Sequence, residues 1–167
     1  MKTQKKKEQT VIKQLATFGL LSIATITANI APAQAGDLNS VAIGGIGMAN
    51  FVPQPDGTFT ILAPLTGSVS NAAGKVTATR KTPTGLEMDM EHYFMTDKGG
   101  FIHTVDLGIL TAVPGKEGRY MIEITYDVQE KESSGELAGF DGTFQSYGLV
   151  DLNKLQGLIR YSGEITK

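Results

Sequence analysis

The chain has 167 residues, enough for one domain of ordinary size, and carries 15 Lys and Arg against 17 Asp and Glu, a formal net charge of −2. It contains no Cys, which excludes disulfides, thiolate metal sites and cysteine nucleophiles. Five lysines and Glu8 give residues 1–35 a net charge of +4, so the other 132 residues carry −6. This acidic balance argues against a nucleic-acid partner, because phosphate backbones are bound by clustered Lys and Arg.

Residues 1–35 have the layout of a secretory signal peptide. Lysines precede an apolar centre at 15–30, and Ala33, Gln34 and Ala35 form the small-x-small pattern of a cleavage site. We expect a helical signal peptide cleaved after Ala35, and a secreted or periplasmic protein with no membrane attachment after cleavage. The alternative is an uncleaved anchor, because the uncharged run at 14–36 is long enough to span a bilayer. Pro32 within that run favours cleavage.

From Val41 onward, apolar and polar residues alternate with a period of two, and Gly, Pro, Asn or Asp separate the alternating runs. Apolar spacing of 3.6 does not persist beyond two turns anywhere in this part. The pattern predicts one all-β domain over residues 36–167, with strands at 41–51, 58–62, 66–70, 75–80, 86–95, 101–110, 119–129, 140–150 and 156–166. Short antiparallel strands of this kind close into a barrel or stack as a sandwich.

The only two histidines lie in the hairpin of strands 86–95 and 101–110. The more apolar face of the first strand carries His92, and that of the second carries His103 together with Phe101, Val105, Leu107 and Ile109. These faces coincide only if the numbers of paired residues add to an odd value, 195 or 197, because a slip of one residue reverses every side chain. Either register predicts that both histidines lie inside the domain.

Three tyrosines also fall on predicted inner faces: Tyr120 and Tyr126 in strand 119–129, and Tyr161 in strand 156–166. A buried tyrosine hydroxyl needs a hydrogen-bond partner. Histidine is a common metal ligand, but a catalytic metal needs about three protein ligands. In the odd registers Asp106 points outward, and no carboxylate joins the histidines. We therefore predict no metal and no cofactor, and either a structural pair of histidines or a His–Tyr cluster with a role in binding or acid–base chemistry.

The glycine pattern from Gly135 through Ala138, Gly139 and Gly142 to Gly148 resembles a segment of the allene oxide cyclase and dirigent superfamily. Residues 92–106, from His92 through Thr104 to Asp106, similarly resemble a segment of bacterial secreted relatives. The two matches cover roughly residues 90–163. The resemblance implies a single eight-stranded antiparallel, calycin-like β-barrel with an interior cavity, and it transfers fold better than activity.

These observations lead us to expect a barrel that binds a small apolar molecule, with His92, His103, Tyr120, Tyr126 and Tyr161 lining its lumen. One alternative is an isomerase or cyclase of the allene oxide cyclase type, and enzyme status is left open because no catalytic residue can be assigned. Another is a structural or partner-binding barrel whose lumen is filled by side chains, since a barrel of eight strands holds side chains or one small ligand. Assembly into a homo-oligomer is compatible with each.

Overall fold

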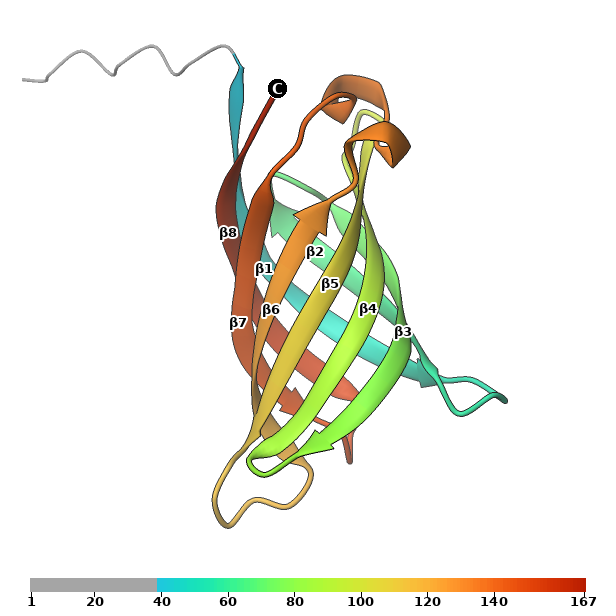
Figure 1. Cartoon of the computed structure of the whole chain (residues 1–167), viewed down its shortest axis with the longest axis vertical. Helices are drawn as coiled ribbons and strands as arrows, with labels where there is room; N and C mark the ends of the chain where they lie inside the picture. The colour runs from blue at the N-terminus through green and yellow to red at the C-terminus, as the bar shows by residue number, and fades with distance from the viewer. Residues whose placement is uncertain (1–38) are drawn as a thin grey trace, which may run out of the picture. The chain divides into compact units, whose positions relative to one another are not determined.

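A computed structural model describes residues 39–167, and the predicted signal peptide at 1–35 lies outside the described residues. Within the described part, the chain forms eight antiparallel strands in one closed barrel, each strand pairing with the next and β8 with β1 (Figure 1). The all-β fold and the eight-stranded antiparallel barrel are thus confirmed. The strands are β1 (Ser40–Pro53), β2 (Phe59–Gly67), β3 (Asn71–Thr82), β4 (Gly85–Met95), β5 (Phe101–Ala112), β6 (Arg119–Val128), β7 (Thr143–Asp151) and β8 (Gln156–Thr166).

The main difference in strand boundaries concerns β2, which replaces the two short strands predicted at 58–62 and 66–70. The strand continues through Pro64, which has a register partner on β3, Asn71, but none on β1. Proline has no N–H to donate, so it is accommodated where a ladder hydrogen bond is not required. The connection to β3 follows at Ser68–Ser70. Residues 71–74, which separate the predicted strands 66–70 and 75–80, belong to β3.

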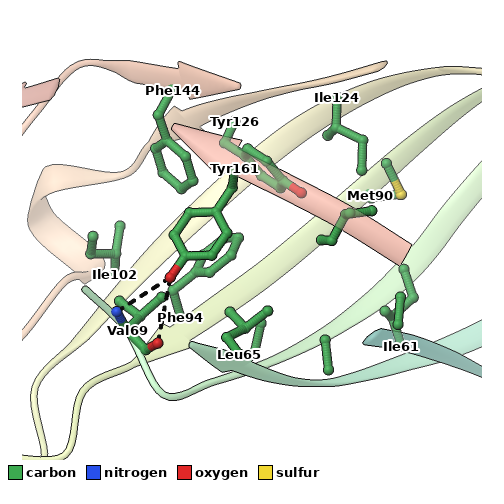
Figure 2. Packing of buried hydrophobic residues seen from close by; sticks show 14 of the residues in the cluster. Ile61, Leu65, Val69, Met90, Phe94, Ile102, Ile124, Tyr126, Phe144 and Tyr161 are labelled. Atoms are coloured by element: carbon green, nitrogen blue, oxygen red, sulfur yellow. Dashed lines mark hydrogen bonds between the residues drawn. The ribbon is translucent and has the colours of Figure 1, made fainter. Parts of the chain in front are cut away.

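The core fills the barrel interior and follows the predicted alternation on β4, β6 and β8. An aromatic layer lies across the lumen, where Tyr126 stacks on Phe144 with ring centroids 4.6 Å apart and meets Phe94 edge-on at 5.0 Å (Figure 2). Tyr161 extends this layer, and its hydroxyl donates to the backbone carbonyl of Thr66 at 2.8 Å. These rings bury large apolar areas from four strands against one another, which holds the barrel closed without disulfides.

The register of β4 and β5 differs from the prediction. His92 lies opposite Thr104 and Tyr93 opposite His103, so the paired numbers add to 196. Ile102, Thr104, Asp106 and Leu110 therefore point inward and are buried, whereas Val105, Leu107 and Ile109 are exposed.

This register turns the more apolar face of β5 to the outside, and the reason lies in the residues that its other face meets inside the barrel. Its inner face suits its neighbours better, because Gly108 leaves room for Met90: a β-carbon at Gly108 would lie 2.6 Å from the Met90 Cε. The inner Asp106 carboxylate also meets His92. The prediction of an inward His103 and an outward Asp106 is wrong.

One end of the barrel is covered by the segment between β6 and β7, which contains two short 3₁₀ helices, η1 (Glu130–Glu132) and η2 (Gly135–Leu137) (Figure 1). A backbone bridge between Ser134 and Phe101 ties this segment to the start of β5. Two residues of this segment, Leu137 and Phe140, are themselves buried. Phe140, predicted as the start of a strand, therefore belongs to the cover.

Candidate functional site

A buried histidine–carboxylate pair lies in the wall of the lumen. Nδ1 of His92 is 2.5 Å from Oδ2 of Asp106, and the two side chains are 5% and 0% exposed. An ionised carboxylate only accepts hydrogen bonds, so Nδ1–H is the donor. In the neutral imidazole, Nε2 is then left as an acceptor for another group.

Adjacent strands determine where this pair lies. His92 on β4 is the register partner of Thr104 on β5. The next inward-pointing residue of β5, Asp106, is the register partner of Met90 on β4. On β3, Gly74 is opposite His92, and a β-carbon there would lie 2.7 Å from Nε2. Glycine at 74 thus makes the space that the imidazole occupies.

Several polar atoms of this cluster have unmet hydrogen-bonding capacity. Asp106 Oδ1 and Thr104 Oγ1 are buried without a partner. Within residues 39–167, His92 Nε2 also has no hydrogen-bond partner, since the one hydrogen bond of this side chain joins Nδ1 to Asp106. Buried polar groups in native proteins are normally satisfied, and an unpaired one costs free energy. The cluster is therefore suited to receive a hydrogen-bonding group from outside the chain.

Tyr126 borders the pair from β6. Its ring centroid is 5.6 Å from that of His92, and its hydroxyl is 3.0 Å from Ser146 Oγ on β7. Burial raises the pKa of the Tyr126 hydroxyl well above its ordinary value; the Ser146 hydrogen bond opposes this shift and the charge of Asp106 adds to it. Tyr126 is therefore neutral at physiological pH.

The space beside His92 is small and apolar. A cavity of about 20 Å³ is bounded by Met90, His92 and Phe94 of β4, by Tyr126, and otherwise by aliphatic or aromatic side chains of β1, β2, β3, β6, β7 and β8. A volume of this size holds about one water molecule. The lumen is thus mostly filled by side chains, and the imidazole is the main polar group at the cavity.

The structure brings two of the five predicted site residues together, His92 and Tyr126. Tyr161 is fully buried in the aromatic layer, but its hydroxyl is already bound to the Thr66 carbonyl. Tyr120 points inward near the other end of the barrel and is only partly buried.

His103 lies outside the barrel wall, contrary to the predicted register, and is covered by the segment that contains η1. Its ring stacks on Tyr93 with centroids 4.5 Å apart, and Nδ1 is 2.7 Å from Oε2 of Glu132. The two atoms are not aligned for a hydrogen bond, and neither ring nitrogen has a hydrogen-bond partner among residues 39–167. The backbone of His103 also accepts from Gln129 N–H and donates to Ser133 Oγ. This position links His103 to the cover and separates it from the lumen.

Sequence reasoning missed Asp106, Thr104 and Ser146 as members of the inner cluster. The available signal was the placement of Thr104 and Asp106 two residues apart, on the same face as Ile102 and Leu110. A face that contains both apolar residues and a Thr–Asp pair is a candidate for a polar site within a core. Among residues 39–167, no group of three or more His, Asp or Glu side chains has the arrangement of a metal site.

No family model matches the chain, and no curated protein or solved structure shows significant similarity to it. In the part of the chain that the structure describes, helices long and apolar enough to cross a bilayer are absent.

Proposed function

We propose that the barrel binds a small, largely apolar molecule in its lumen and that His92 hydrogen-bonds one polar group of this molecule. The observation that carries the proposal is that His92 borders an apolar cavity and that its Nε2 has no hydrogen-bond partner among residues 39–167. Asp106, which is bonded to Nδ1 of His92, and Thr104 each also have one buried oxygen without a partner in this part of the chain. An apolar wall with a few polar groups is the usual composition of a small-molecule site. Nε2 accepts from a ligand hydroxyl or amine, while Asp106 holds the ring in position.

The ligand has to displace side chains, because the cavity has a volume of only about 20 Å³. Met90 is suited to move, since it borders the cavity and has three rotatable bonds. We therefore propose a ligand of few non-hydrogen atoms, or one admitted by rotation of Met90.

We also propose export of the chain through its N-terminal segment, and kinship with the allene oxide cyclase and dirigent superfamily on the basis of the glycine pattern at 135–148. Both proposals rest on the sequence. Cleavage after Ala35 would give a mature protein that begins at Gly36, and mass spectrometry would show the mass of residues 36–167. A chain that retains Met1 would contradict export by cleavage.

Native mass spectrometry of the protein purified from its own host tests the ligand proposal. A small molecule that copurifies with the chain, and is lost from His92→Phe, is the expected result. Tyr161→Phe is the matched control, because it alters another buried aromatic side chain whose hydroxyl is occupied by the Thr66 carbonyl. Absence of any bound molecule from the wild-type protein would favour a structural barrel with a filled lumen.

A second function, acid–base isomerisation of an apolar substrate, is favoured by the His92–Asp106 geometry. A carboxylate at Nδ1 orients the imidazole and stabilises its protonated form, so that Nε2 can remove a proton from one carbon and return it to another. This function predicts turnover of the copurified molecule, and loss of turnover with retained binding in Asp106→Asn. Binding without turnover in the wild-type protein would exclude it.

A further inference from the structure

The outer surface of the barrel differs between its two sides. On β3 and β4 the exterior is charged, and Arg80 forms ion pairs with Glu87 and Asp89. On β5, β6, β7, β8 and β1 the exterior presents large apolar side chains to solvent. Exposed apolar residues are ordinary when scattered, but a contiguous group marks an interaction surface.

Four of these apolar residues form one continuous row across four neighbouring strands. Met121 is the register partner of Leu149, Leu149 of Leu158, and Leu158 of Met48. Their exposed fractions are 52%, 43%, 55% and 45% in the order Met121, Leu149, Leu158, Met48. We call these residues the apolar row.

A second row of side chains runs beside the apolar row. Its charges are arranged so that the row is complementary to a second copy of itself. Tyr147 on β7 lies between Glu123 on β6 and Arg160 on β8, and the flanking partners are Ile109 and Ile46. Read across the five strands, the order is apolar, acidic, tyrosine, basic, apolar. Within residues 39–167, neither Glu123 nor Arg160 has an ion-pair partner.

We propose that this face binds a second copy of the chain about a two-fold axis that lies in the interface and runs along β7. Such an axis exchanges the strands on either side of β7, so it places Glu123 of each copy opposite Arg160 of the other. It also places Met121 opposite Leu158, and Leu149 and Tyr147 opposite themselves. Two sheets packed face to face keep their strands nearly aligned and lie about 10 Å apart, which lets these side chains meet.

The proposal accounts for two features of one face at once. In the dimer, the apolar row of each copy packs against that of the other copy and is removed from water, and this burial drives association. Glu123 and Arg160, which have no ion-pair partner within residues 39–167, form two symmetric ion pairs that fix the register of the interface and disfavour other arrangements. An isologous interface of this kind closes on itself, so assembly stops at the dimer.

Sedimentation velocity on the protein produced from the full chain, over a wide range of concentrations, tests the proposal. Wild type is expected to have twice the mass of one chain. Arg160→Glu and Glu123→Arg should each halve that mass, because each places like charges opposite one another. The double variant Glu123→Arg/Arg160→Glu should restore the dimer, since the exchanged pair is again complementary.

A matched control separates this face from exposed apolar residues in general. Leu149 and Leu107 are both 43% exposed, but Leu107 lies on β5 outside the two rows. Leu149→Glu should give a monomer, and Leu107→Glu should leave the dimer intact. Far-ultraviolet circular dichroism shows whether each variant is folded.

The lack of cysteines gives an independent readout. Tyr147→Cys lies next to the proposed axis and should form a disulfide with its own copy under mild oxidation, whereas Leu107→Cys should not. A monomeric wild type, a trimer, or a double charge variant that does not recover the dimer would each overturn the proposal.

Discussion

The buried His92–Asp106 pair predicts a strongly non-additive effect on stability. The variants are His92→Leu, Asp106→Leu and the double variant. The Asp106 side chain is 0% exposed, and His92 is the only hydrogen-bond partner of its carboxylate among residues 39–167, since Oδ1 is unpaired there. His92→Leu removes this partner. Leaving a buried charge without its partner costs about 3–5 kcal/mol. That is a large part of the roughly 5–15 kcal/mol that stabilises a domain.

The other two variants should cost less. Asp106→Leu leaves a neutral imidazole with one unpaired N–H, which costs about 1–3 kcal/mol. The double variant removes both polar groups, and replacement of a buried pair by apolar residues is often neutral or stabilising by about 1–4 kcal/mol. We therefore expect the double variant to be more stable than His92→Leu by several kcal/mol, on the order of the cost of the lone charge.

Urea unfolding followed by circular dichroism gives the three free energies, and tyrosine fluorescence is a second probe because the chain has no Trp. A double variant destabilised by the sum of the two single effects would refute the reasoning, since it would mean that the two groups do not interact. A double variant as stable as wild type would instead indicate that the pair is retained for a reason other than stability. Binding or catalysis at His92 is the reason that we propose.

Four further predictions concern other positions. Tyr126→Phe leaves the buried Ser146 hydroxyl without a partner and should cost about 1–3 kcal/mol in urea unfolding, most of it recovered in Tyr126→Phe/Ser146→Ala. The pKa of Tyr126 is raised in the folded protein, so this residue contributes stability at pH values below the ordinary tyrosine pKa of about 10, and the contribution is lost as the pH rises above that value. Above about pH 10 the melting temperature of wild type should therefore fall more steeply with pH than that of Tyr126→Phe. Gly45→Ala would place a β-carbon against the Thr66 carbonyl and 2.6 Å from the Tyr161 hydroxyl, so it should lower the melting temperature far more than Gly44→Ala, where the β-carbon would lie 3.5 Å from the Tyr161 carbonyl oxygen; equal effects would contradict this geometry. Hydrogen bonds from Arg80 lower the pKa of Asp89, and titration by nuclear magnetic resonance should show that pKa rising towards its ordinary value in Arg80→Ala but not in Lys81→Ala.

The local pattern of the chain determined most of the strands. Period-two alternation and turn residues predicted the strands, and the inner faces of β4, β6 and β8 follow from it because each has one face much more apolar than the other. His92, Tyr126 and Tyr161 were placed inside for that reason, and all three are buried. Alternation is a property of neighbouring residues, so it can be read without knowing what the strand packs against.

Only the tertiary structure decided which face of β5 points inward. Both of its faces contain several apolar residues, so alternation divides the strand into two sets without saying which one meets the core. The choice depends on neighbours distant in sequence: Met90 fills the space above Gly108, and His92 pairs with Asp106. The same choice put His103 beneath the segment that carries Glu132. The sequence by itself therefore determined an all-β chain of antiparallel strands and left both a barrel and a sandwich open. Closure into a barrel and the polar site inside it arose from contacts between strands.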